Sequence, residues 1–238
     1  MRLYFCVLFL GLNALADVTT VGLPADAING DPFGGPLPGF VGTRYQQAYA
    51  STDFPGPMAI TSISFFNDSP FEGPLPVATY MIFLSTITSG IDTLSNTNFD
   101  SNDGSDKTLF ALGDLSGLAP LQLVFDGGPF DYNPAVGNLL MDIQLSNEVA
   151  SGGAFYDARS GTATGIFSRY QNFSAGTQGF GLVTQFTFAS VPEPSMIVLL
   201  VGGLGGLILA HCSRRSFGRV RQVQSAVDDF GVEASQRD

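Results

Sequence analysis

The sequence predicts an all-β protein whose two antiparallel sheets pack as a sandwich of the jelly-roll or lectin-like type. Three observations predict this class. Short apolar segments recur along the middle of the chain. Their residues alternate with polar ones at the period of a strand. Stretches rich in Gly and Pro separate them, and the 238 residues include 29 Gly and 14 Pro, which favours turns over long helices.

The clearest predicted strand covers residues 139–146. Its odd-numbered positions are all apolar, and three of its four even-numbered positions are polar, as in a strand that is buried on one face. The other predicted strands are 59–66, 77–85, 108–112, 121–125, 154–158, 165–170 and 182–188. Eight or more strands are enough for two packed sheets.

Gly and Pro gather at three places, and they predict loops over residues 32–38, 70–76 and 126–134. The chain is also rich in Phe, with 21 residues, and has no Trp. Large rings bury much apolar area without needing a polar partner, so we expect the Phe side chains to fill the space between the sheets.

Residues 1–16 have the pattern of a signal peptide and predict a short N-terminal signal helix. Arg2 precedes an apolar run over residues 3–12, and Ala14 and Ala16 form a small-x-small cleavage site. The alternative is a buried helix or strand at the start of a cytosolic protein. The signal reading predicts cleavage after Ala16, so that the β-sandwich domain covers residues 17–190.

A second apolar segment, residues 196–212, predicts a transmembrane helix. As a helix its 17 residues span about 25 Å, slightly less than a bilayer core of about 30 Å. The arginines at positions 214, 215, 219 and 221 are expected to hold this end in the cytoplasm, which leaves the domain outside. Residues 216–238 are polar and predict a disordered cytoplasmic tail.

The element Pro192-Glu193-Pro194, the apolar helix after it and the pair Arg214-Arg215 together resemble the PEP-CTERM sorting signal over residues 191–215. The resemblance implies a Gram-negative bacterium whose membrane protease-transpeptidase, exosortase, cleaves near Pro-Glu-Pro. It also implies transfer of the domain to the cell surface or to an extracellular matrix of exopolysaccharide. In this chain 23 residues follow Arg215, whereas such signals normally end soon after the arginines. The alternative is an ordinary single-pass anchor.

Composition excludes several classes of function. Residues 17–190 contain 16 Asp and Glu but only four basic residues, a formal net charge of −12, so we expect no binding to nucleic acid. The two cysteines, Cys6 and Cys212, and the one histidine, His211, all lie outside residues 17–190. Disulfides, Cys/His zinc sites and His-based catalytic triads are therefore excluded from the domain.

One loop is a candidate calcium site. Oxygen donors alternate along it and a Gly follows, and calcium takes six to eight hard oxygen ligands. The candidate ligands are Asn98, Asp100, Asn102, Asp103 and Asp106. Their register does not match an EF-hand loop, and the alternative is a solvated turn rich in Asp and Asn. No other cofactor is predicted.

Two tyrosines are candidates for stacking on a sugar, because exposed rings commonly serve as carbohydrate platforms. They are Tyr45 and Tyr132; the alternative for both is packing at the edge of the core. Glu72 and Glu148 could serve a glycosidase only as a facing pair, and nothing in the sequence pairs them.

The sequence therefore predicts a non-enzymatic, exported protein of structural or interaction type. Its predicted partners are exosortase, the membrane and exopolysaccharide. The alternatives are a carbohydrate-binding module, with or without calcium, and a polysaccharide-acting hydrolase.

Overall fold

The computed structural model describes residues 16–34, 44–67, 73–150, 152–160, 165–172, 174–178 and 180–190. This part of the chain is all-β, and its helical structure is limited to three short 3-10 helices, η1 (Ser51–Asp53), η2 (Ile91–Thr93) and η3 (Phe99–Asn102). The strands are β1 (Ala16–Val21), β2 (Ala27–Asn29), β3 (Arg44–Tyr49), β4 (Met58–Phe66), β5 (Val77–Ile87), β6 (Thr108–Leu115), β7 (Gln122–Tyr132), β8 (Asn138–Ala150), β9 (Tyr156–Ser160), β10 (Ile166–Asn172), β11 (Ser174–Gln178), β12 (Phe180–Leu182) and β13 (Thr184–Ser190).

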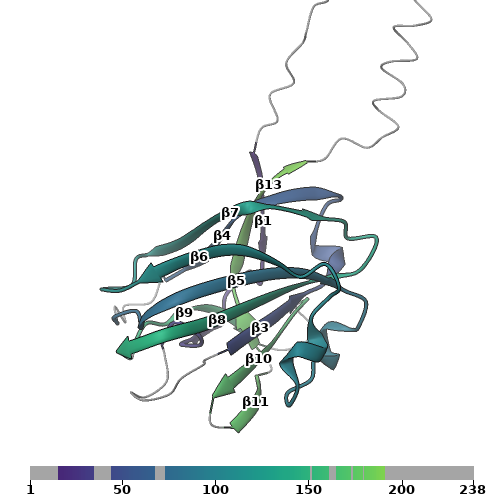
Figure 1. Ribbon diagram of the computed structural model, residues 1–238. Helices are drawn as coiled ribbons and strands as arrows, with labels where there is room; N and C mark the ends of the chain where they lie inside the picture. Colours follow the sequence, from purple (N-terminus) through teal and green to yellow (C-terminus); the bar gives the residue numbers. More distant parts are fainter. Residues whose placement is uncertain are drawn as a thin grey trace, which may run out of the picture. The chain divides into compact units, whose positions relative to one another are not determined.

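The strands form antiparallel sheets in a sandwich-like arrangement. A four-stranded sheet has the order β1-β13-β4-β7, a six-stranded sheet the order β11-β10-β3-β8-β5-β6, and a three-stranded sheet the order β12-β9-β2. Figure 1 shows the six-stranded sheet in front, with β13 passing behind it. The predicted all-β class and its antiparallel sheets are therefore confirmed.

One hydrophobic core lies between the sheets. On β8, the odd-numbered residues from Leu139 to Leu145 are all buried in it, as the period of two predicts. Aromatic rings fill much of the remaining space: Phe33 lies 5.0 Å from Phe65 and 4.9 Å from Tyr156 between ring centroids. The prediction that Phe side chains fill the space between the sheets is confirmed for the eight that belong to this core: Phe33, Phe54, Phe65, Phe110, Phe125, Phe130, Phe186 and Phe188.

Each of the eight predicted strands overlaps a strand of the structure, but β1, β2, β3 and β11 were not predicted. Strand β3 is the instructive omission, because its sequence is polar and yet Tyr45, Gln46, Gln47 and Tyr49 are all fully buried. A buried amide must be hydrogen-bonded to be tolerated. On the inner face of the sheet, Gln47 Oε1 accepts from the backbone N–H of Leu182 at 2.7 Å and Gln47 Nε2 donates to its carbonyl at 2.9 Å.

The prediction of a loop over residues 126–134 is wrong. Strand β7 continues to Tyr132 through Gly127, Gly128 and Pro129. These three residues form a bulge, because Asp126 pairs with Ser62 while Phe130 pairs with Ile60. Strand β7 is also the edge of the four-stranded sheet, where a proline without an N–H is tolerated.

The two ends of the domain are held together. Strand β1 begins at Ala16, β13 ends at Ser190, and Ala16 pairs with Ala189 across the sheet. The predicted signal helix, apart from Ala16, and the predicted sorting signal, transmembrane helix and tail all lie outside the described residues.

The bulge in β7 predicts that alanine substitutions at two neighbouring glycines differ in their effect on stability. A Cβ atom at Gly127 would lie 2.6 Å from the carbonyl oxygen of Phe110 on β6, whereas at Gly128 it would meet nothing within 4 Å. We expect Gly127→Ala to lower the free energy of unfolding by about 1–3 kcal/mol, because it forces the β6 and β7 backbones apart. Gly128→Ala is the control and should leave urea denaturation nearly unchanged. Equal effects of the two substitutions would refute the close approach.

The buried tyrosines predict alkaline unfolding. Burial raises the pKa of the phenols of Tyr45, Tyr49, Tyr132 and Tyr156 above the ordinary value. A raised pKa means that the folded state keeps protons which the unfolded state loses, so stability is lost as the pH rises above about 10. We expect tyrosinate absorbance to appear together with the loss of the β-sheet circular dichroism signal. Tyrosinate formation by these four phenols with the sheets intact would contradict their burial.

Candidate functional site: the outer face of the six-stranded sheet

The outer face of the six-stranded sheet is partly covered by residues 88–107, hereafter the 88–107 segment, which contains η2 and η3. Beneath it lies a second, smaller apolar cluster. Leu94 of the segment packs there with Ala48 on β3, Leu140 on β8 and Phe167 on β10. This cover explains why Leu140 is fully buried although it lies on the face of β8 opposite the main core.

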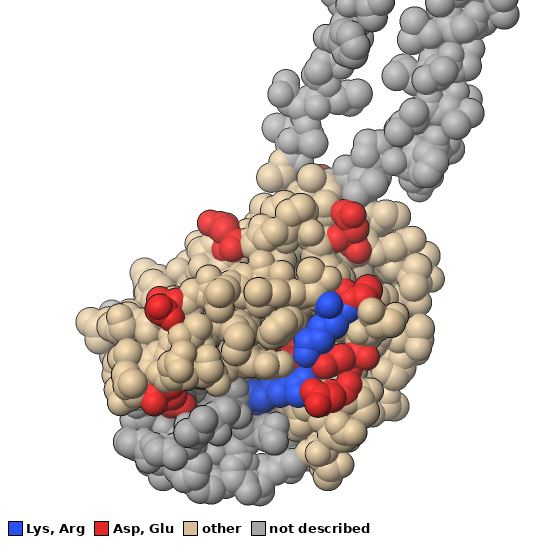
Figure 2. All heavy atoms as spheres, viewed as in Figure 1, with Lys and Arg blue, Asp and Glu red and all other residues tan. Residues whose placement is uncertain are grey.

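An ionic network fixes the segment to the sheet. Arg44 on β3 holds Asp142 on β8 in two hydrogen bonds, Nε to Oδ1 at 2.9 Å and Nη2 to Oδ2 at 2.7 Å. The same guanidinium reaches the segment, with Nη1 2.6 Å from Asp100 Oδ1 and Nη2 3.1 Å from Asp103 Oδ2. Lys107 Nζ completes the network, 2.6 Å from Asp142 Oδ2 and 2.7 Å from Asp103 Oδ2. Figure 2 shows Lys and Arg side chains grouped on this face, next to several Asp and Glu side chains.

Amide side chains extend the attachment. Gln46 Nε2 donates to the carbonyl of Phe99 at 3.1 Å, and Gln46 Oε1 accepts from Asn102 Nδ2 at 2.8 Å. On β10, the Arg169 guanidinium lies 4.0 Å from the ring centroid of Phe167 and donates from Nε to the carbonyl of Leu94 at 2.9 Å. Polar side chains from β3, β8 and β10 therefore all hold the same segment.

The charges shift two pKa values. Burial of the Arg44 guanidinium opposes its charge, but the hydrogen bonds and charges of Asp142 and Asp100 outweigh burial and raise its pKa above the ordinary value. The hydrogen bond and charge of Arg44 lower the pKa of Asp100. Arg44 and Asp100 therefore stay ionised at neutral pH.

The candidate calcium ligands lie in and beside η3, and most contact other groups of the protein. Asp100 and Asp103 pair with Arg44, and Asn102 bonds to Gln46. Asn98 caps η3 by accepting from the backbone N–H of Ser101 at 3.3 Å. Asp106 Oδ1 accepts from the backbone N–H of Thr86 at 2.7 Å.

These contacts bear on the prediction that the loop binds calcium. Two of its three carboxylates, those of Asp100 and Asp103, pair with the cations Arg44 and Lys107 of the same chain. Within the described residues, no three Asp, Glu, His or Cys side chains come together in a geometry that could hold a metal ion. Calcium binding stays a prediction without a preformed site.

The two candidate stacking tyrosines are buried, and this corrects the expectation of exposed platforms. Tyr45 is fully buried and its hydroxyl donates to Gln47 Oε1 at 2.5 Å. Tyr132 is 1 % exposed, its hydroxyl donates to the carbonyl of Gly137 at 2.8 Å, and its ring meets Phe54 edge to face at 5.0 Å. Both rings therefore stabilise the core by packing. Their burial is tolerated because each hydroxyl has a hydrogen-bond partner inside the protein.

Of the two glutamates considered for hydrolysis, Glu72 lies outside the described residues. Glu148 lies in a bulge of β8 opposite Ala78, and neither of its buried carboxylate oxygens has a hydrogen-bond partner. Burial raises the pKa of this carboxyl.

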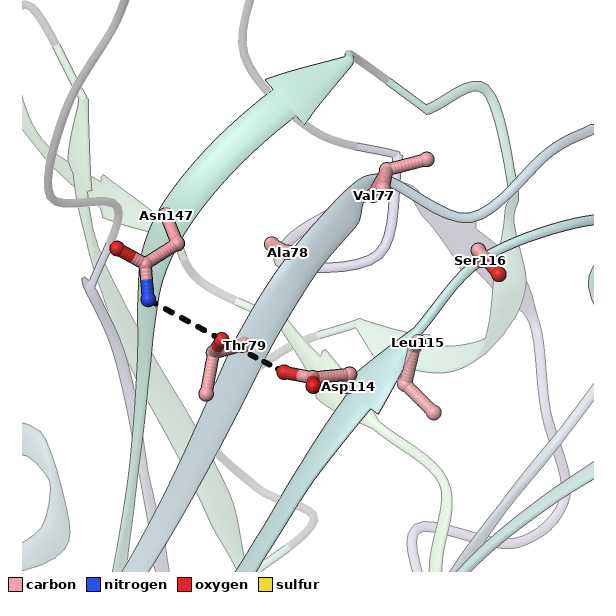
Figure 3. A pocket seen from close by; sticks show the side chains of 7 residues that line it. All are labelled: Val77, Ala78, Thr79, Asp114, Leu115, Ser116 and Asn147. Atoms are coloured by element: carbon pink, nitrogen blue, oxygen red, sulfur yellow. Dashed lines mark hydrogen bonds between the residues drawn. The ribbon is translucent and has the colours of Figure 1, made fainter.

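Two clefts lie at opposite ends of β5. The first, of about 320 Å³, is lined by residues of β5 and β6 and by Asn147 of β8 (Figure 3). Within it Thr79 Oγ1 donates to Asp114 Oδ1 at 2.7 Å and accepts from Asn147 Nδ2 at 3.3 Å. The second, of about 310 Å³, lies between the end of β5 and the 88–107 segment, and Thr86, Ser89 and Asp103 are among its lining residues.

Comparison with protein-family models, curated proteins and solved structures finds no match to the chain. Within the described residues, none of the helical segments has the length and apolar character needed to cross a bilayer. The sorting residues Pro192, Glu193, Pro194, Arg214 and Arg215, and Ala14 of the cleavage site, lie outside those residues, whereas Ala16 opens β1.

Sequence reasoning missed the ionic network. Asp142 was assigned to the face of β8 opposite the core, which is correct, but nothing local indicated that Arg44 lies beside it, 98 positions away. The one feature of the sequence that pointed to it is the small number of basic residues. Because the domain has four basic residues and 16 carboxylates, pairing of each basic side chain with a carboxylate could have been expected.

The ionic network predicts that replacing Arg44 strongly destabilises the domain. Arg44→Met removes both hydrogen bonds to Asp142, whose side chain is only 2 % exposed, and leaves Lys107 as the one cation of the network for Asp142, Asp103 and Asp100. We expect a loss of about 3–5 kcal/mol in the free energy of unfolding.

Arg159→Met is the matched control, because the Arg159–Asp26 pair is 3.4 Å long with side chains 27 % and 37 % exposed. It should cost about 1 kcal/mol or less in urea denaturation. Adding Asp142→Leu to Arg44→Met should recover part of the loss. Equal losses for Arg44→Met and Arg159→Met would show that the network does not hold the 88–107 segment.

Proposed function

We propose that the chain is an exported, exosortase-sorted protein of the cell surface or extracellular matrix, and that its β domain acts through structure and interaction rather than catalysis. One observation carries the proposal: Pro192-Glu193-Pro194 stands between a folded domain and an apolar segment followed by paired arginines. Strand β13 ends at Ser190, two residues before Pro192. A sorting protease needs its target outside the folded domain, and the last strand of the domain ends before the Pro-Glu-Pro element begins.

The beginning of the domain supports the same proposal. Strand β1 starts at Ala16, and Ala16, Asp17 and Val18 are exposed. Cleavage after Ala16 would leave Asp17 to Val21 to complete the edge of the four-stranded sheet. The predicted signal peptide and the predicted sorting signal therefore flank the folded domain without removing any of its buried residues.

The charge distribution suits an extracellular domain. All four basic residues of the domain contact oxygen atoms of the protein: Arg44 and Lys107 in the ionic network, Arg159 at Asp26, and Arg169 at Leu94. The remaining surface is acidic and is repelled by anionic lipid head groups and nucleic acid. High negative charge also favours solubility outside the cell.

The proposal includes four predictions made from the sequence. They are the jelly-roll or lectin-like topology, the signal helix 1–16, the transmembrane helix 196–212, and the partners exosortase, membrane and exopolysaccharide. A stable β domain without cysteine suits export, because its core does not depend on disulfide formation.

Mass spectrometry of the native protein tests the proposal. We expect a mature chain that begins at Asp17 and ends near Pro194. Arg214→Ala combined with Arg215→Ala should cause a longer form that retains Asp238 to accumulate in the inner membrane. Arg219→Ala combined with Arg221→Ala is the matched control and should be processed normally.

Two results would contradict the proposal to different degrees. A wild-type chain that begins at Asp17 but keeps Asp238 in the membrane would refute sorting and leave export standing. A soluble cytosolic chain that keeps both Met1 and Asp238 would refute export as well.

A further inference from the structure

The outer face of the six-stranded sheet has a part that the 88–107 segment leaves open. It consists of cross-strand rows on β6, β5 and β8. Leu112 pairs with Met81, which pairs with Gln144; Thr79 lies in the row on one side, and Leu109, which pairs with Phe83, lies in the row on the other. The five residues Leu109, Leu112, Thr79, Met81 and Gln144 are hereafter the open strip.

The two sides of the open strip differ in chemistry. On β6, Leu112 is 63 % exposed and Leu109 is 46 % exposed. On β8, Gln144 is half-buried and uses one amide N–H to bond Asp142 at 3.0 Å, so its other polar positions can face a ligand. Lys107 covers the ring of Phe83 at 4.7 Å, so the apolar contact comes from Leu109, Leu112 and Met81.

The shape of the open strip suits a chain better than a single small molecule. The first cleft, of about 320 Å³, includes Thr79 and extends the open strip at the start of β5. The second cleft lies beyond Ser85, which is 2 % exposed beneath the 88–107 segment and accepts a hydrogen bond from the backbone N–H of Gly104. From the row of Thr79 to the row of Phe83 the strand runs about 13 Å at ~3.3 Å per residue, the length of two or three sugar rings. The first cleft offers hydroxyl, amide and carboxylate groups, those of Thr79, Asn147 and Asp114 (Figure 3).

The net negative charge of the domain limits which ligands the open strip can bind. Anionic polymers are disfavoured, because the domain has a net charge of −12 and its four cations already have partners. A second copy of this chain carries the same negative charge and is disfavoured for the same reason. Saturated sugar rings have an apolar C–H face and hydroxyl groups at the edge, which match a strip that is apolar along β6 and polar along β8.

From this geometry we infer that the open strip binds an extended, uncharged polysaccharide chain. The sugar C–H groups lie on Leu109, Leu112 and Met81, and the hydroxyls bond to Gln144 and to the polar groups of the first cleft. The inference rests on the proposed location outside the cell, where such a polymer is present.

Affinity electrophoresis of the full chain in detergent tests the inference. Native gels contain hydroxyethylcellulose, which is uncharged, or carboxymethylcellulose, which is anionic. We expect retardation by the uncharged polymer and none by the anionic one. Because the full chain is used, the result does not depend on sorting.

Two variants locate the binding surface. Leu112→Asp should weaken binding to hydroxyethylcellulose about tenfold or more, since it replaces an apolar contact with a charge. Val124→Asp, on β7 of the other sheet and 47 % exposed, is the matched control and should bind like the wild type. Circular dichroism confirms that both variants are folded.

Three results would overturn the inference. They are no retardation of the wild type by hydroxyethylcellulose, equal retardation of the two variants, and stronger binding to carboxymethylcellulose than to hydroxyethylcellulose. None of them bears on processing of the chain, which the mass of the native protein measures separately.

Discussion

The polar strand β3 is buried on both faces of the central sheet, and the arrangement around it follows from the need to satisfy its side chains. Unpaired amides and charges in a protein interior are costly, so each must find a partner. On the inner face, Gln47 bonds to the backbone of Leu182 and thereby ties the six-stranded sheet to β12. On the outer face, Arg44 and Gln46 bond to β8 and to the 88–107 segment. A strand with polar side chains on both faces therefore joins three parts of the fold.

The same requirement shapes the surface. The domain has only four basic residues, and each contacts oxygen atoms of the protein. The carboxylates outside these contacts then dominate the electrostatic field around the molecule, which discourages polyanions and like-charged neighbours. What remains for recognition is the uncharged, partly apolar area that the 88–107 segment leaves uncovered on β5, β6 and β8. The covered part of the sheet is held by the ionic network, and the open part is the surface to which we assign polysaccharide binding.

The sequence allowed some parts of this structure to be predicted and not others. Residues 139–146 were assigned to a strand with the correct buried face, because a period of two is a local property. Strand β3 was missed because its burial depends on Leu182 and Asp142, which are distant in sequence. The Gly-Gly-Pro stretch in β7 was misassigned because the rule against proline holds for central strands and relaxes at an edge. In the loop 98–106 the acidic residues were predicted as calcium ligands, but Asp100 and Asp103 pair with the distant side chains of Arg44 and Lys107, which no local pattern indicates.

The pairing of the first strand with the last has a mechanical consequence. Strand β13 lies between β1 and β4, and both neighbours run antiparallel to it. Tension applied to the chain beyond Ser190 along the strand axis would load the hydrogen bonds on both sides of β13 in shear, so that many must break together. A strand at the edge of the sheet, pulled sideways, would instead open one bond at a time. A domain attached through its C-terminal strand in this way resists extraction by drag far better than its equilibrium stability alone would indicate.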